Sequence, residues 1–210
     1  MILTRRLLAV VLLALPCAVS LGLASRPRTT SPPSSPSREP AYRANNLGVA
    51  LLEQYRFADG VEQFKKAVAL DPQFAQAQIN LAIGLLYVPD VGAAQKEATR
   101  AAALAPEAAQ PPYVLGLIAR QENRPEDAER YFREVRAKDP TDVGASVNLG
   151  QVLLQQRRYA DAIPLLEASV KAEPYNVTAT YNLGVALTRA GRRAAPLFAG
   201  RPHAVGQRRG

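Results

Sequence analysis

A phrase built on Leu-Gly or Leu-Ala recurs through this chain every 34 residues. It reads NNLGVAL at 45–51, VNLGQVL at 147–153 and YNLGVAL at 181–187, with looser copies at 79–85 and 113–119. Prolines keep the same interval, at Pro72, Pro106, Pro140 and Pro174. Two independent series of markers with one period predict an array of repeated structural units.

The period divides the chain into units at 41–74, 75–108, 109–142 and 143–176, followed by a partial unit at 177–190. Apolar and small residues recur within each unit at spacings of three and four, which predicts amphipathic helices. Turn-forming residues and the prolines separate the helical stretches, so each unit is expected to be a helical hairpin. One hairpin cannot bury both of its faces, and the units must therefore stack. The sequence predicts an all-α solenoid of about four and a half helix pairs.

The units resemble the tetratricopeptide repeat. That family sets Leu-Gly in the first helix, a small residue and an aromatic in the second, and Pro near the end. The first unit fits with Leu47, Gly48, Gly60, Phe64, Ala67 and Pro72, and the third fits with Leu115, Gly116, Ala128, Phe132 and Pro140. The chain has no Trp for the family's early tryptophan position, and the second unit departs further, with Ala82 and Ala98. The resemblance covers about residues 41–190 and implies a right-handed superhelix that binds other proteins.

The N-terminal region is typical of an export signal. Residues 1–24 begin with Arg5 and Arg6, continue with an apolar run from Leu7 to Leu23, and reach the small residue Ala24. This order predicts a secretory signal peptide and a periplasmic or cell-envelope location. The alternative is an uncleaved membrane anchor through residues 7–23, because 17 residues are at the lower limit for crossing a bilayer.

Residues 25–40 read SRPRTTSPPSSPSREP and contain almost nothing apolar. Such a segment cannot bury enough surface to fold, so we expect a disordered tether. Cleavage after Ala24 would also remove Cys17, the only cysteine, and with it any disulfide or thiolate chemistry.

The charge of the chain is concentrated at its ends. Although the formal net charge is +8, residues 41–190 contain 16 basic and 17 acidic residues. A balanced repeat region has no basic stripe for a phosphate backbone, so nucleic acid is not expected as a partner. The single histidine, His203, has no catalytic motif around it, and no phosphate loop or metal-ligand spacing occurs. We expect no enzyme activity and no metal or other cofactor.

The first helices of stacked hairpins line one surface, on which side chains three, four and seven residues apart share a side. Counted from the start of each unit, positions 5, 6, 9, 12 and 13 are expected to point to that surface. Amides occupy position 6 in all units but the third, which has Val114, and tyrosines stand nearby. The predicted peptide-binding groove contains Asn46, Asn80, Asn148, Asn182, Tyr87, Tyr113 and Tyr181. Amides can hydrogen-bond to the backbone of an extended peptide, although the same residues could equally be solvated surface amides.

Some members of the family hold a terminal carboxylate with lysines and an arginine in this groove. Positions 2, 5 and 6 of the present units supply no Lys or Arg. A carboxylate clamp of that kind is therefore not expected.

Residues 191–210 are rich in Gly, Pro and Arg and lack the helical period. They do not provide the polar closing helix that the last unit of an array needs, which leaves open a truncated or frameshifted copy of a longer array. The Ala, Arg, Gly and Pro usage is typical of a GC-rich bacterial genome. We expect an exported bacterial scaffold for protein–protein interaction; the alternative is the regulatory or substrate-docking region of a larger enzyme or envelope assembly machine.

Overall fold

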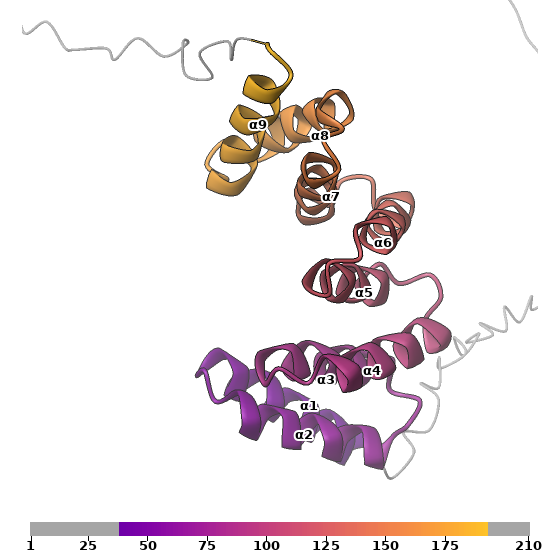
Figure 1. Cartoon of the computed structure of the whole chain (residues 1–210). Coiled ribbons are helices and arrows are strands. Elements are labelled where there is room, and N and C mark those ends of the chain that lie inside the picture. Colours follow the sequence, from indigo (N-terminus) through magenta and orange to yellow (C-terminus); the bar gives the residue numbers. More distant parts are fainter. Residues whose placement is uncertain (1–37, 193–210) are drawn as a thin grey trace, which may run out of the picture. The chain divides into compact units, whose positions relative to one another are not determined.

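The computed structural model describes residues 38–192, and this part of the chain consists of α-helices without strands (Figure 1). The odd-numbered helices are α1 (Arg38–Glu53), α3 (Ala75–Tyr87), α5 (Gln110–Gln121), α7 (Val143–Gln155) and α9 (Val177–Arg189). The even-numbered helices are α2 (Phe57–Leu70), α4 (Val91–Leu104), α6 (Pro125–Lys138) and α8 (Tyr159–Ala172). The predicted all-α repeat array is confirmed.

The proline series sets the end of every even-numbered helix. Each of these helices has 14 residues, and each ends two residues before a proline of the series. The ring of a proline disfavours helical geometry in the residue before it. Accordingly, Asp71 has φ −139° and ψ 91°, and Asp139 has φ −135° and ψ 92°. Because these stops are 34 residues apart, the helices repeat with the same interval.

The turn inside each hairpin also repeats. Three residues join α1 to α2, and the backbone N–H of the third, Arg56, donates to the carbonyl of Leu51 at 2.9 Å. The middle residue has a positive φ in four of the turns in the described range: Tyr55, Asn123, Arg157 and Gly191. The arginine that follows pairs with an aspartate in the first turn of the even helix at Arg56–Asp59, Arg124–Asp127 and Arg158–Asp161. These contacts fix the direction in which the chain returns.

Glycine allows the two helices of a hairpin to approach closely. A Cβ added at Gly116 of α5 would lie 2.7 Å from Cε1 of Phe132 on α6, closer than carbon atoms can pack. The first and fourth hairpins repeat this arrangement, with Gly48 against Phe64 and Gly150 against Leu166. Phe64 and Phe132 are fully buried. The small residue therefore sets how closely the two helices of these hairpins approach.

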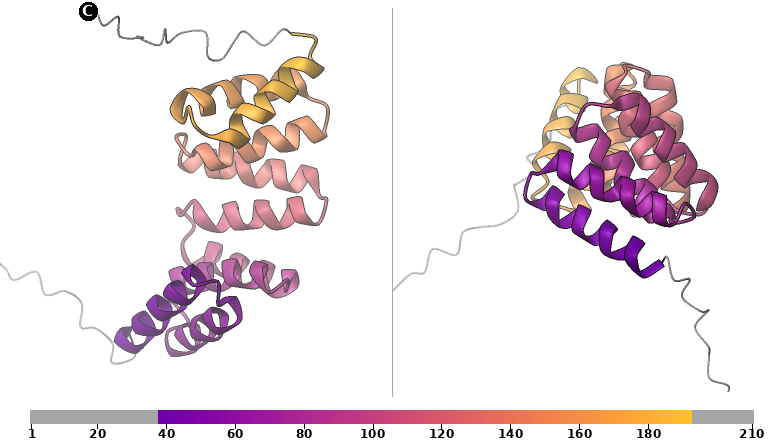
Figure 2. Two further views of the ribbon diagram at one scale, coloured as in Figure 1. Left: turned by 90° about the vertical axis from the view of Figure 1, so that its left-hand side faces the viewer. Right: turned by 90° about the horizontal axis from the view of Figure 1, so that it is seen from below.

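Stacking of the hairpins produces the core. One cluster of buried side chains extends from α2 to α5, and a second extends from α5 to α9. Tyr131 of α6 packs against both clusters. Every helix contacts the next one along the chain, and in addition α1 contacts α3, α3 contacts α5 and α7 contacts α9 (Figure 2). The odd-numbered helices thus lie side by side in one layer.

The first helix begins earlier than predicted. We expected the folded region to start at residue 41, but α1 begins at Arg38, within the segment 25–40 that was predicted to be disordered. Pro40 is compatible with this start because the first turn of a helix has no intrahelical partners for its N–H groups. The predicted signal peptide, residues 25–37 of the tether and residues 193–210 of the tail lie outside the described range. None of the helices within it is long and apolar enough to cross a membrane.

Gly116→Leu should destabilise the protein because the new side chain collides with the buried ring of Phe132. We expect a loss of about 1–3 kcal/mol in the free energy of unfolding, which is the usual effect of overpacking. Gly92→Leu on α4 is the matched control, since a Cβ at Gly92 would meet no atom of the described residues within 4 Å. Thermal unfolding followed by circular dichroism would measure both, and equal midpoints for the two variants would contradict the packing argument.

Candidate peptide-binding face

The odd-numbered helices present one shared surface, here called the odd-helix face. It is formed by positions 2, 6, 9 and 13 of the units, which lie on one side of a helix, with position 12 at its edge. Position 6 is buried in the third and fifth units. In the second unit these positions are Gln76, Asn80, Ile83 and Tyr87, all at least partly exposed. The face is therefore rich in amides and aromatic rings, as expected.

Position 5 differs from the prediction because it faces the neighbouring odd helix. Asn45, Ile79 and Val147 are only 5%, 3% and 6% exposed. The layer of odd helices is packed tightly enough to cover this position, which a count along one isolated helix does not reveal. In these three units position 5 belongs to the interface between odd helices, whereas Tyr181, at position 5 of the last unit, is 70% exposed.

The predicted amides at position 6 join neighbouring helices. Asn80 of α3 donates from Nδ2 to Oδ1 of Asn45 on α1 at 2.8 Å, and its own Oδ1 accepts from Gln76 at 3.0 Å. Asn148 of α7 donates to the hydroxyl of Tyr113 on α5 at 3.0 Å and to the carbonyl of Gly144 at 2.8 Å. These amides form part of the structure, and their free hydrogen-bonding capacity is correspondingly small.

Positions 5 and 6 of successive units therefore form a series of pairs, 35 residues apart, along the layer. Two pairs are polar, Asn45 with Asn80 and Tyr113 with Asn148. Between them comes an apolar pair, because both Ile79 and Val114 are buried. The last pair is mismatched: Asn182 is buried beside α7, where the corresponding residue is Val147. Within the described range the Nδ2 of Asn182 has no hydrogen-bond partner.

The remaining predicted residues are dispersed. Asn46 is exposed on α1 beside Asn45, whose Nδ2 donates to it at 3.4 Å. The ring of Tyr87 is 58% exposed and stacks on Phe57 of α2, with the ring centres 4.6 Å apart. Tyr181 is 70% exposed on α9. Of the seven predicted residues, the structure brings only Tyr113 and Asn148 into direct contact with one another.

The sequence analysis did not identify Arg120, which organises the middle of the odd-helix face. Its Nη1 donates to Oδ1 of Asn148 and to Oε1 of Gln151. These partners are neutral, and no carboxylate in the described range forms an ion pair with Arg120. An exposed guanidinium whose charge is not compensated is available to an acidic ligand. The only signal in the sequence was a charged residue at position 12, where other units have leucine, such as Leu52 and Leu154.

A pocket of about 350 Å³ opens beside Tyr113, at the other end of the same network. Its walls include Ile83, Val114, Asp139 and Asp142. Oδ1 of Asp139 accepts from the N–H of Thr141, and Oδ1 of Asp142 accepts from the N–H of Ala145. Burial and the negative charge of Asp142 raise the pKa of Tyr113, while the hydrogen bond from Asn148 and the charge of Arg120 lower it to a lesser degree. The hydroxyl therefore stays protonated near neutral pH, and the site has an acidic pocket at one end and a guanidinium at the other.

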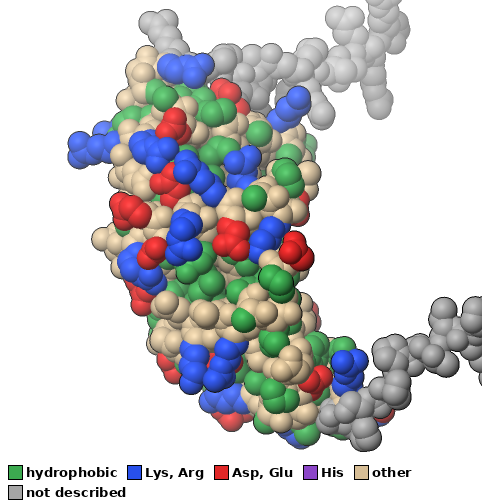
Figure 3. Space-filling model, turned by 90° about the vertical axis from the view of Figure 1, so that its right-hand side faces the viewer, with side chains coloured by type: hydrophobic (Ala, Val, Ile, Leu, Met, Phe, Trp, Pro, Cys, Tyr) green, Lys and Arg blue, Asp and Glu red, His purple; other side chains and the backbone are tan. Residues whose placement is uncertain are grey.

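Charges elsewhere are distributed evenly. Figure 3 shows a face on which basic and acidic side chains alternate without a continuous basic stripe. Many of them are paired, as Glu129 is with Arg158 at 2.8 Å and with Arg133 at 2.7 Å. Among the described residues, no group of three or more His, Cys, Asp or Glu side chains could hold a metal ion.

Comparison with known families agrees with this arrangement. Tetratricopeptide repeat profiles match residues 41–70, 119–163 and 147–195, together about half of the chain. The chain belongs to the tetratricopeptide repeat family. Repeats of this kind generally serve as non-catalytic interaction modules, and the match and the fold together support a protein-interaction scaffold. No curated protein sequence gives a significant match.

Solved structures with the same fold have low sequence identity to this repeat protein. YrrB, described as a TPR protein with an unusual peptide-binding site, is 20% identical with a TM-score of 0.60, and the match covers 73% of this chain and 79% of YrrB. The MamA protein is 18% identical with a TM-score of 0.63 over 73% of this chain and 84% of MamA. The first TPR of Spaghetti (RPAP3), bound to an HSP90 peptide, is 16% identical with a TM-score of 0.55 over 57% and 95%. These likenesses establish the fold.

Asn182→Val should stabilise the repeat array. The change replaces a buried amide that lacks a partner and re-creates beside Val147 the apolar pair seen at Ile79 and Val114. Relief of one unsatisfied group is expected to raise the free energy of unfolding by about 1–3 kcal/mol. Asn148→Val is the matched control and should lower stability, because it removes the partner of Tyr113. Denaturant unfolding would measure both variants. A loss of stability in Asn182→Val would show that Asn182 makes a favourable interaction in the folded protein.

Proposed function

We propose that this protein is a scaffold that binds an extended peptide segment across α5 and α7 on the odd-helix face. The observation that supports this most strongly is the uncompensated guanidinium of Arg120, held in place by Asn148 and Gln151. Structures of two proteins with this fold are described as having a peptide-binding site or a bound peptide, which is consistent with such a role.

The charges of the site indicate the chemistry of the segment. A carboxylate of the ligand would approach Arg120, and a basic or hydrogen-donating side chain would enter the pocket lined by Asp139 and Asp142. Tyr113 and Arg120 are seven residues apart on α5, which corresponds to about 10 Å along a helix. An extended peptide advances about 3.3 Å per residue. The favoured segment therefore contains opposite charges about three residues apart.

Exposed amides complete the proposed contact surface. Gln151 and Gln155 lie at positions 9 and 13 of α7, one helical turn apart on the odd-helix face, and Gln110 borders the pocket. Gln151 accepts from Arg120 through Oε1, and Gln155 donates from Nε2 to Asn123, so each uses one amide atom within the protein. Such amides can both donate to and accept from a peptide backbone, which gives affinity with little demand on sequence. These amides supplement the predicted position-6 asparagines, of which Asn80 and Asn148 hydrogen-bond between helices.

A peptide array tests the proposal directly. The full-length protein, applied to immobilised random peptides, should retain members in which a basic and an acidic residue are two to four positions apart. Arg120→Ala should weaken binding of the retained peptides by about 10- to 100-fold, since charge-assisted hydrogen bonds contribute about 1.5–3 kcal/mol. Lys66→Ala, an exposed change on α2, is the control. Retention without a charge preference, or equal affinity in the two variants, would contradict the proposed site.

The scaffold is proposed to act outside the cytoplasm, in the periplasm or cell envelope of a bacterium. This part of the proposal rests on the basic start, the apolar run from Leu7 to Leu23 and the polar segment that follows. Fusion of residues 1–40 to a reporter that is active only in the periplasm should give activity. Replacement of Leu12 and Leu13 by Arg should abolish it, because charge in the apolar region prevents export. An inactive reporter that accumulates in the cytoplasm without these changes would refute export.

A further inference from the structure

The described part of the array ends on an odd-numbered helix with an open side. In the first, third and fourth hairpins the even helix covers a glycine of its odd partner, as Phe132 covers Gly116. In α9 the equivalent glycine is Gly184, and a Cβ built there would meet no atom of residues 38–192 within 4 Å. The turn at the end of α9 nevertheless repeats the other turns, since the N–H of Arg192 donates to the carbonyl of Leu187 at 2.9 Å.

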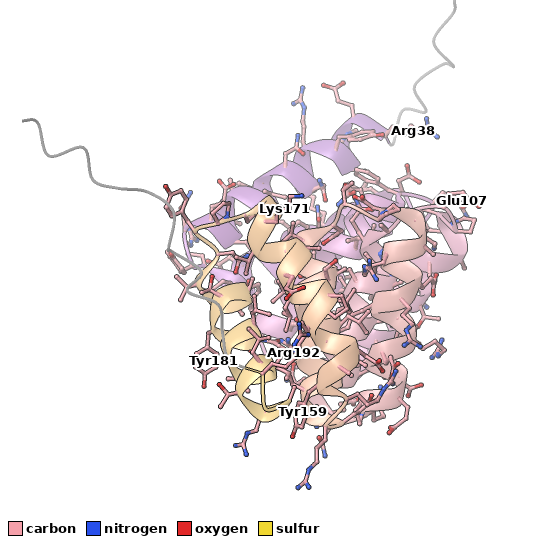
Figure 4. The ribbon with its side chains drawn as sticks, turned by 90° about the horizontal axis from the view of Figure 1, so that it is seen from above. Arg38, Glu107, Tyr159, Lys171, Tyr181 and Arg192 are labelled. Atoms are coloured by element: carbon pink, nitrogen blue, oxygen red, sulfur yellow. The ribbon has the colours of Figure 1, made fainter. Side chains whose placement is uncertain are left out.

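The open side of α9 is apolar and exposed. Val177, Tyr181, Gly184 and Thr188 lie on one side of the helix, and Val177 and Tyr181 are 80% and 70% exposed. Figure 4 shows Tyr181 projecting from α9 on the side away from α8. Tyr181 and Val177 border a pocket of about 360 Å³ together with Pro174, Tyr175 and Thr180. So exposed an aromatic and aliphatic surface at the end of a repeat array requires an apolar cover.

At the equivalent sequence distance beyond α9 there is no bulky side chain. Phe64, Phe132 and Leu166 each stand 16 residues after their glycine, and the residue 16 after Gly184 is Gly200. α9 itself carries a bulky aromatic side chain that could fill such a space. Tyr181 is as large as the phenylalanines and lies one helical turn from Gly184.

We propose that the open side of α9 is covered by α9 of a second copy of this chain, in an antiparallel pair with two-fold symmetry. In this register Tyr181 of each copy enters the space over Gly184 of the other, and Val177 lies opposite Thr188. Tyr181 and Gly184, and likewise Val177 and Thr188, are equally far in sequence from the midpoint between Asn182 and Leu183. A single antiparallel register therefore forms both kinds of contact. A two-fold interface must be self-complementary in this way. The surface is distinct from the peptide site on α5 and α7.

The charges at the ends of α9 favour the same register. Glu173 precedes the helix and Arg192 follows it, and both are exposed and equally distant from the midpoint. An antiparallel pair therefore brings Glu173 of each copy to the end at which Arg192 of the other lies. Glu173 accepts a hydrogen bond from Asn176 at 2.8 Å and is exposed. Opposite charges at the rim of an interface fix its register and suppress wrong pairings.

The oligomeric state of the full-length protein, solubilised in mild detergent, tests the pairing. Light scattering over about 1–100 µM should show a concentration-dependent dimer, since a single pair of helices gives a small interface of modest affinity. Gly184→Leu fills the space and should raise the dissociation constant at least about tenfold, with helicity unchanged, because bulk at a packed contact prevents close approach. Gly92→Leu on α4 is the control, since its added side chain also enters open space.

An exchange of the two residues makes the test specific. The double variant Tyr181→Gly, Gly184→Tyr exchanges the positions of the ring and of the space. Its dissociation constant for the two-fold dimer should lie within about threefold of the original value. Tyr181→Gly alone should stay monomeric. A wild-type protein that is monomeric throughout, or a dimer unaffected by Gly184→Leu, would overturn the proposal. Either result would assign the cover of α9 to residues 193–210 or to another protein.

Discussion

The contact between a small residue and a bulky apolar side chain within a hairpin determines the geometry of this array. The side chain of Phe132 occupies space that exists only because Gly116 has no Cβ. This contact sets the distance between α5 and α6. The same distance determines how completely the other apolar side chains between the two helices are buried. The second hairpin shows a variation, since Ala82 and Ala98 are buried in the same cluster and Gly84 approaches Val61 of the preceding hairpin. The repeat therefore tolerates a smaller filling residue when a close contact forms nearby.

Much of the fold could be predicted because its determinants are local and periodic. The prolines end the even helices through the conformation of the preceding residue, and this effect depends only on adjacent positions. The start of α1 at Arg38 was harder to predict from the sequence, because the Ser, Pro and Arg residues around it suggest disorder by composition. The helix there is stabilised by contacts that lie far along the chain, such as Arg38 with Asp71.

The binding face was harder to predict because exposure depends on neighbouring helices. A count along one helix placed position 5 on the surface, whereas the adjacent odd helix covers it. Asn148 and Tyr113 were identified as polar residues of the face, but their mutual hydrogen bond joins two units and has no local signal. Arg120 was missed for a related reason: its importance arises from the amide oxygens of α7, 28 and 31 residues away. The sequence therefore predicts which helices form the face more reliably than which side chains remain free on it.

Polar and apolar pairs alternate between successive odd helices, so each interface in the layer differs in chemistry from the next. Repeats that are too alike can stack out of order, with one unit skipped or exchanged with a neighbouring chain. If α7 took the place of α5 beside α3, Asn148 would lie against Ile79 and lose the hydroxyl of Tyr113. Each such mismatch would bury an unpaired amide, at about 1–3 kcal/mol. The polar pairs between odd helices thus favour the native stacking order over other orders of hairpins that have nearly the same fold.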